Sequence, residues 1–309
     1  MTAVTLVLVA LALDAALGEP RRFHPLVGFG RLAQATQARL YGPADMTARK
    51  RRWRGLLAVA ILIAPFALVA AAVRQTLFGA ALDVMLLYFA IGWKSLGEHA
   101  VRVRDALRVG DLPAARAAVG LMVSRDTEAM NAGDVSKAAI ESVLENGNDA
   151  IFGAILWFVI AGGAGALAYR LANTLDAMWG YRTARYRDFG WAAARLDDVL
   201  NFIPARFTAL SYALAGRTRP ALACWRAQGV RWKSPNAGPV MAAGAGSLGI
   251  VLGGPACYHG EQQMRPALGC GRAPASDDID GALALIRWSL AIWMAVLLGG
   301  SVLVRYVLP

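Results

Sequence analysis

The stretch GLLAVAILIAPFALVAAAV, residues Gly55–Val73, decides the fold class, because it contains no charge between Arg54 and Arg74. A helix needs about 20 mainly apolar residues to cross the hydrocarbon core of a bilayer. The sequence therefore predicts an integral membrane protein.

Further apolar stretches follow the same pattern. The clearest are Thr76–Trp93, Ala150–Tyr169 and Trp288–Val304, and weaker ones are Thr2–Leu17, which Asp14 interrupts, and Val199–Gly216, which Arg206 interrupts. The first of the weaker stretches lacks a basic leader and an A-x-A site, so it is not interpreted as a cleaved signal peptide. We expect an all-α, polytopic membrane protein with four or five transmembrane helices, re-entrant segments and polar cytoplasmic helices.

Composition supports this class. Hydrophobic residues make up 57% and charged residues 17% of the 309 residues, whereas soluble domains average roughly 45–50% apolar and about 25% charged residues. Three cysteines without a C-x-x-C pair predict neither a disulfide framework nor a zinc ribbon. The net charge of +11 is explained by topology and anionic lipid headgroups. We expect no nucleic-acid partner, because no nucleic-acid-binding signature is present.

Arginine and lysine indicate the orientation. Glu19–Arg54 carries nine basic residues and two acids and is expected in the cytoplasm. A simple crossing at Ala150–Tyr169 would then place the Arg-rich segment Arg170–Asp198 outside, against the positive-inside rule. Either the rule fails, or the glycine run Gly162–Gly165 breaks this helix into a re-entrant hairpin. The protein is expected in the inner (cytoplasmic) membrane, as a single domain over residues 1–309, with its polar segments 94–149, 170–206 and 231–281 on the cytoplasmic side.

The first of these polar segments contains a row of acids. Glu141, Glu145 and Asp149 recur at i, i+4 and i+8, which places them on one face of a helix. A solvated face and a ligand or Mg²⁺ role are both open for this row. Nearer the N-terminus, His24 lies in a turn between Pro20 and Pro25, where a structural role and a catalytic one remain alternatives.

The segment Asn173–Arg206 is the richest in chemistry. It interleaves five arginines with the acids Asp176, Asp188, Asp197 and Asp198. Lipid headgroups would repel these acids, whereas Mg²⁺ binds one or two carboxylates together with phosphate oxygens. The pattern therefore predicts a Mg²⁺–phosphate ligand. The glycine-rich stretch that starts near Asn236 favours either an anion site or close helix packing.

Standard catalytic signatures are absent. The sequence contains no G-x-x-x-x-G-K-[ST] loop, no G-x-S-x-G and no H-E-x-x-H. A Walker-type nucleotide site, a serine hydrolase and a zinc protease are therefore not indicated.

Four segments carry a resemblance to a known family. They are LDAALGEPRRFHPLVGFG, SRDTEAMNAGDVSKAAIESVLENGNDAI, LAYRLANTLDAMWGYRTARYRDFGWAAARLDDVLNFIPAR, and SPNAG followed by LGGPACYHG. Together they resemble the CobD/CbiB family of cobalamin-biosynthesis proteins, the adenosylcobinamide-phosphate synthases. The segments are spread over most of the chain, from Leu13 to Gly260, and follow the family's order.

The resemblance implies an ATP-dependent acid–amine ligase. Such an enzyme joins (R)-1-amino-2-propanol, or its O-phosphate, to the free propionate of adenosylcobyric acid. A carboxylate must be activated for this reaction, most simply as an acyl phosphate made from ATP with Mg²⁺, and the amine must lose a proton. The candidate catalytic residues are Glu141, Glu145, Asp176, Asp197 and Asp198, of which the three aspartates are candidate Mg²⁺ ligands. The candidate substrate- and phosphate-binding residues are His24, Arg125, Asp126, Asn173, Tyr181, Arg182, Asp188, Arg195, Asn201 and Asn236.

Two other functions remain as alternatives. A Mg²⁺-dependent prenyl- or phospho-alcohol transferase would use Asn173-x-x-Asp176 and Asp197-Asp198 as diphosphate ligands. A corrinoid transporter or scaffold would use Asp83 and Arg206 as a substrate path. The expected partners are the corrinoid, the aminopropanol or its phosphate, the bilayer, and either a second copy of the chain or later cobalamin-assembly enzymes.

Overall fold

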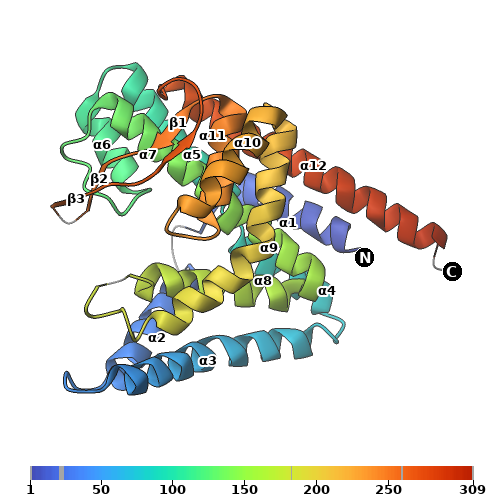
Figure 1. Cartoon of the computed structure of the whole chain (residues 1–309). Helices are drawn as coiled ribbons and strands as arrows, with labels where there is room; N and C mark the ends of the chain where they lie inside the picture. Colours follow the sequence, from blue (N-terminus) through green and yellow to red (C-terminus); the bar gives the residue numbers. More distant parts are fainter. Residues whose placement is uncertain (1, 21–23, 182, 259, 308–309) are drawn as a thin grey trace. The chain divides into compact units, whose positions relative to one another are not determined.

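The computed structural model describes residues 2–20, 24–181, 183–258 and 260–307, and it is built mainly of helices (Figure 1). The chain forms two compact units, each made of two separate stretches. Unit 1 comprises Met1–Gly92 and Asp149–Asn201, and unit 2 comprises Trp93–Asn148 and Phe202–Pro309. The expectation of a single domain over the whole chain stays a prediction.

Unit 1 is helical. It contains α1 (Ala3–Leu17), α2 (Pro25–Leu40), α3 (Ala48–Val73), α4 (Gly79–Ala90), α8 (Gly153–Trp179) and the start of α9 (Trp191–Ala215). Helix α8 packs against α3 and α4, and α2 lies beside α3 (Figure 1). Buried side chains such as Phe29, Leu62, Leu175, Trp179 and Phe189 fill the core between them. Burying large apolar groups of this kind stabilises a fold by about 1.5–3 kcal/mol per side chain.

The apolar stretch Gly55–Val73 is helical, as predicted, and lies within α3. Many of its large apolar side chains are exposed, among them Leu57, Leu68 and Val69. A contiguous apolar face of this kind marks a membrane contact rather than a water-exposed surface. The described residues contain four helical stretches that are long and apolar enough to cross a membrane, Ala48–Val73, Gly79–Arg108, Ala132–Trp179 and Asp277–Leu303. The all-α polytopic fold is thus confirmed.

Helix α8 is broken at its glycine run. Ala161 (φ −133°) and Gly162 (φ 65°, ψ −156°) leave the helical region. Gly153 lies against the Tyr169 ring, so that a Cβ at Gly153 would overlap the ring. In a straight helix these two residues would be roughly 24 Å apart. The segment therefore folds back as a helical hairpin, which is the second of the two alternatives given for this stretch.

A buried carboxylate fixes the tip of this hairpin. Asp83, on α4, accepts a hydrogen bond from the backbone N–H of Gly163 at 2.9 Å. It also pairs with the Arg74 guanidinium at 3.2 Å. The freed backbone at the break is thus satisfied by protein, which is the condition for a non-helical backbone at membrane depth.

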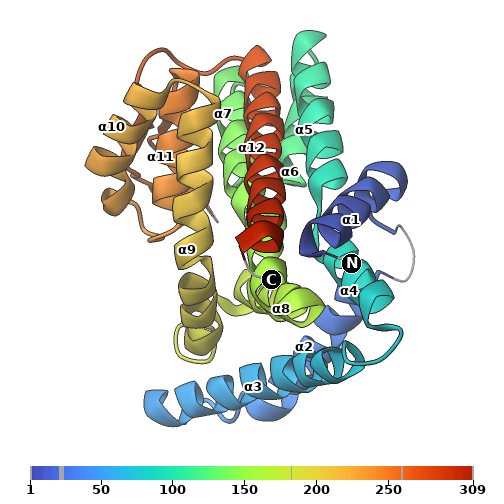
Figure 2. The same cartoon turned by 90° about the vertical axis from the view of Figure 1, so that its right-hand side faces the viewer.

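Unit 2 combines helices with short strands. Its helices are α5 (Trp93–Arg108), α6 (Leu112–Gly120), α7 (Ala132–Gly147), the end of α9, α10 (Thr218–Gln228), the 3₁₀ turn η2 (Gly229–Arg231), α11 (Ala237–Leu248) and α12 (Asp277–Val307). Helices α5, α7 and α12 lie side by side (Figure 2). Arg108 on α5 pairs with Asp277 on α12 at 2.7 Å.

The glycine-rich region after Asn236 contains one short buried helix, α11, followed by four strands. Strand β1 (Val251–Gly253) pairs antiparallel with β4 (Ala267–Gly269), and β2 (Ala256–Tyr258) pairs antiparallel with β3 (Glu261–Gln263). The all-α expectation misses these strands, because three-residue strands leave almost no periodic pattern in a sequence.

Candidate functional site

The residues singled out from the sequence fall into two groups, one in each unit. Unit 2 contains Arg125, Asp126, Glu141, Glu145 and Asn236. Unit 1 contains His24, Asn173, Asp176, Tyr181, Asp188, Arg195, Asp197, Asp198 and Asn201. Arg182 lies outside the described residues.

Glu141, on α7, is buried and held by several donors. Its Oε2 atom pairs with the Arg125 guanidinium and with Nη1 of Arg265, the latter at 2.9 Å. Its Oε1 atom accepts the backbone N–H of Gly253 at 2.7 Å. A carboxylate held by two guanidiniums stays ionised and has its lone pairs engaged. The geometry therefore suits Glu141 to positioning two arginines, and its candidate catalytic role stays a prediction.

The segment between β1 and β4, which includes β2 and β3, brings Arg265 to this carboxylate. Gly253 adopts φ 75° and lies against the Pro266 carbonyl, so that a side chain at this position would be strained and would clash. Arg265 donates Nε to the Gly254 carbonyl at 3.0 Å. Its guanidinium also lies 5.2 Å from the centre of the Trp232 ring, a cation–π distance. These contacts fix the direction of the guanidinium before any ligand arrives.

A polar cavity of about 260 Å³ adjoins the two arginines. Glu145 and Asn146 from α7 line it together with Arg125, Tyr258 and Arg265. The Asn146 amide donates to the Ser142 carbonyl at 2.9 Å, which orients its oxygen. Arg125 and Arg265 carry two positive charges and Glu141 carries one negative charge, which leaves one positive charge for a ligand. Glu145 adds a carboxylate to another part of the cavity wall. The cavity can therefore bind an anion and a protonated amine in one molecule.

The two other unit 2 candidates make local contacts. Asp126 accepts the backbone N–H of Gly260 at 2.7 Å and the Cys257 thiol at 3.3 Å, and the latter bond raises the pKa of Cys257. Asn236 accepts a hydrogen bond from Arg206 at 2.6 Å. These contacts join loop to loop and helix to loop, and their predicted substrate roles stay predictions.

In unit 1, carboxylates and amides from α8 and α9 converge around Asp197. Its Oδ1 atom accepts the Asn173 amide at 3.2 Å and the Asn201 amide at 3.1 Å. Asn201 in turn accepts the Tyr169 hydroxyl at 2.8 Å. Burial, Asp149 and Asp198 raise the pKa of Asp197 to about 7, against the opposing effect of the two amides. Asp176 interacts electrostatically with both Asp197 and Asp198. Asp176 and Asp197, two of the candidate Mg²⁺ ligands, therefore lie close enough for their charges to interact.

Asp149 belongs to this group as well. It lies in the π-helical turn η1 (Asn148–Phe152), which follows α7, and its charge acts on Asp197. Among the described residues, no three His, Cys, Asp or Glu side chains are close enough together to hold a metal ion alone. A Mg²⁺ ion bound here would complete its shell with water and ligand phosphate oxygens. The Mg²⁺ role of Asp176, Asp197 and Asp198 stays a prediction.

Of the remaining unit 1 candidates, two make contacts within the fold and two line a cavity. Asp188 pairs with Arg52 at 3.0 Å, and His24 caps α2 by accepting the Leu26 N–H on Nδ1 at 3.2 Å. His24 thus has a structural role in the fold. Tyr181 and Arg195 line a second cavity, of about 410 Å³, together with Asp198.

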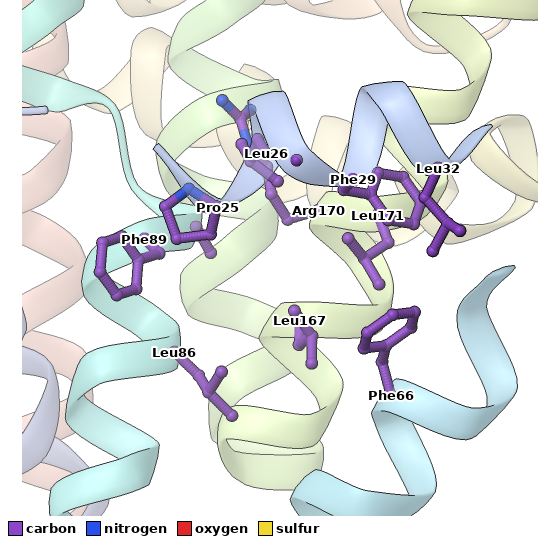
Figure 3. Close-up of a pocket in the computed structure, with 12 residues that line it drawn as sticks. Pro25, Leu26, Phe29, Leu32, Phe66, Leu86, Phe89, Leu167, Arg170 and Leu171 are labelled. Carbon is purple, nitrogen blue, oxygen red and sulfur yellow. The ribbon is translucent and has the colours of Figure 1, made fainter. Parts of the chain in front are cut away.

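An apolar hollow of about 270 Å³ lies among α2, α3, α4 and α8 (Figure 3). Phe29, Phe66, Phe89 and Leu167 form its wall, and Arg170 is its charged lining residue. This lining offers hydrocarbon contacts and few polar groups. We assign no chemistry to it.

Sequence reasoning missed Arg265, Trp232 and Arg52. Arg265 lies 124 positions from Glu141, its partner, and no local spacing connects the two. Arg52 belongs to the basic run in the first turns of α3, a run that the sequence alone explains as a topology signal. Its proximity to Trp191, with a cation–π distance of 5.9 Å, follows only from the tertiary fold.

Fold and sites together define a polytopic helical membrane protein with two polar sites of mixed arginine and carboxylate character. Residues 7–286 match the model of one family, described as CobD/Cbib protein. The chain belongs to this CobD/CbiB family, and it is a cobalamin-biosynthesis protein.

Curated relatives agree with the family over nearly the whole chain. A protein of Chromobacterium violaceum named "Cobalamin biosynthesis protein CobD" is 52% identical over 299 residues, with 96% of each chain covered. One of the same name from Stutzerimonas stutzeri is 54% identical over 295 residues, covering 94% of this chain and 96% of the relative. Another from Mycobacterium tuberculosis is 38% identical, covering 91% and 90%. No solved structure matches the chain.

Proposed function

We propose that the protein joins (R)-1-amino-2-propanol O-phosphate to the free propionate of adenosylcobyric acid as an amide, at the expense of ATP and Mg²⁺. The observation that carries this proposal is the unit 2 cavity, where Arg125 and Arg265 lie beside Glu145. An amino-alcohol phosphate carries an anion and an ammonium group on a short chain, and the cavity offers a complement to each. This charge pattern favours the phosphate over the free amino alcohol.

The chemistry follows from the groups present. The propionate oxygen leaves as inorganic phosphate while ATP becomes ADP, so the condensation releases no free water. The ammonium group gives one proton to Glu145 before its nitrogen attacks the activated carbonyl carbon, and the second proton is lost as the amide forms. Arg125 and Arg265 hold the phosphate of the amine, and Glu141 holds the two guanidiniums in place.

The proposed location is the inner membrane, with the polar segments facing the cytoplasm, where ATP is available. The basic segment Glu19–Arg54 favours this orientation. The transporter alternative gains nothing from the structure, because Asp83 pairs with Arg74 and Arg206 donates to Asn236. Both groups are therefore engaged in holding the fold. The transferase alternative is tested by the product of the reaction.

Replacing Glu145 by glutamine tests the proton-transfer role. General base catalysis contributes about 10²–10⁴-fold to rate, so Glu145→Gln should lower kcat for amide formation by about 100-fold or more. Glu128→Gln is the matched control, because Glu128 is exposed in the same unit and does not line the cavity. Amide formation by Glu145→Gln at the rate of the control would refute the assignment.

A further inference from the structure

The second cavity of unit 1 is basic and aromatic. It lies between the start of α3, the loop before α9 and the first turns of α9, and its volume is about 410 Å³. Arg52, Arg187 and Arg195 line it together with Tyr181 and Trp191. Pockets for small ligands and cofactors span about 300–1,000 Å³, so this one is large enough for such a molecule.

The charges of this cavity are only partly neutralised within the protein. Asp188 pairs with Arg52 at 3.0 Å, and Asp198 approaches Arg195 at 3.4 Å. Arg187 is exposed and makes no side-chain ion pair within the part of the chain that the structure describes. Helix α9 begins at Trp191 on the cavity wall, and the first turn of a helix leaves backbone N–H groups without intrahelical partners. Both features favour an anionic ligand.

Carboxylates adjoin the same cavity. Asp198 lies on its wall and interacts electrostatically with Asp176, which also interacts with Asp197. These acids would repel a bare polyphosphate. A divalent cation between carboxylate and phosphate removes the repulsion, and Mg²⁺ characteristically binds one or two carboxylates together with phosphate oxygens. The donor set therefore fits a magnesium–polyphosphate complex better than it fits a simple anion.

We propose that this cavity binds the Mg²⁺ complex of a nucleoside triphosphate. Arg187 and Arg195 contact the phosphates, Asp198 faces the cation, and the exposed ring of Trp191 offers a stacking surface for the base. This inference rests on the proposed function, because it locates the ATP that the ligation consumes. The site has no glycine-rich phosphate loop, which explains why no nucleotide motif is visible in the sequence.

Direct binding tests the site without relying on turnover. Purified full-length protein in detergent would be titrated with Mg·ATP by calorimetry, and photolabelled with 8-azido-ATP followed by peptide mapping. The label should map to residues 180–198. Arg187→Ala and Trp191→Leu should each weaken Mg·ATP binding by about tenfold. Arg39→Ala, which removes an exposed arginine of the same unit outside the cavity, should leave the Kd unchanged.

Two outcomes would overturn the inference. One is amide formation with an unchanged KM for ATP in Arg187→Ala and Trp191→Leu, which would leave the proposed function standing. The other is displacement of bound ATP by phosphatidylglycerol in nanodiscs with no dependence on Mg²⁺, which would identify a lipid-headgroup site. Conversely, Mg²⁺-dependent binding that maps to residues 180–198 without amide formation would support the site and refute the proposed function.

Discussion

Replacing Glu141 by glutamine keeps the shape of the side chain and removes the charge that holds Arg125 and Arg265. The side chain is 1% exposed, and its two partners are 12% and 11% exposed. A hydrogen bond to a charged group contributes about 1.5–3 kcal/mol, and breaking a buried ion pair by removing one partner costs about 3–5 kcal/mol. We therefore expect Glu141→Gln to lower the free energy of unfolding by about 3–5 kcal/mol.

The assay is equilibrium unfolding of the detergent-purified protein, followed by circular dichroism and tryptophan fluorescence. Glu98→Gln is the matched control, because Glu98 is half-exposed and lies 3.9 Å from Arg102; it should cost at most about 0.5 kcal/mol. Adding Arg265→Met to Glu141→Gln should cost less than Arg265→Met costs in the wild type, since one unpaired charge is then removed. A loss of stability below about 1 kcal/mol for Glu141→Gln, close to that of Glu98→Gln, would refute this account of the Glu141 ion pairs.

Two further predictions concern unit 1. Gly162→Ala should destabilise the protein by about 1–3 kcal/mol in the same unfolding assay, because φ 65° and ψ −156° are accessible essentially only to glycine and a Cβ would lie 2.6 Å from the Arg74 guanidinium. Gly97→Ala, at an open position in α5, should be neutral or stabilising, and equal losses in the two variants would contradict the hairpin. Burial lowers the pKa of His24; the charge of Glu19 opposes this shift and that of Arg170 adds to it. The stability that the neutral His24 side chain contributes by capping α2 should therefore be fully present above pH 6.5. It should be lost as the pH falls through the folded-state pKa. His24→Asn, which caps in either condition, should remove this pH dependence of stability, and an unchanged dependence would show that another group titrates.

Membrane class and the main helices could be predicted from local sequence alone. The run Gly55–Val73 needs only its length and lack of charge to specify a membrane helix, and Gly162 needs only its missing side chain to mark a break. Both signals are contained in one short window of the chain. Asp176 and Asp197 lie on the consecutive helices α8 and α9, and their electrostatic interaction depends on how these two helices pack.

The partners of Glu141 could not be foreseen in this way. Arg265 reaches Glu141 only because β1 and β4 pair, and these strands are too short to leave a pattern. The π-helical turn at Asn148–Phe152 is likewise absent from the spacing of the acids, because a row at i, i+4 and i+8 assumes a regular helix. Long-range pairing and local departures from helical periodicity are the two kinds of information that spacing does not contain.

The most direct test of the proposed ligation is mass spectrometry of the purified protein incubated with adenosylcobyric acid, Mg·ATP and either aminopropanol or its O-phosphate. The account predicts a corrinoid heavier by one condensed aminopropanol phosphate, with one ATP consumed for each amide formed, and a lower rate with the free amino alcohol. Binding of the corrinoid without amide formation from either amine would contradict it.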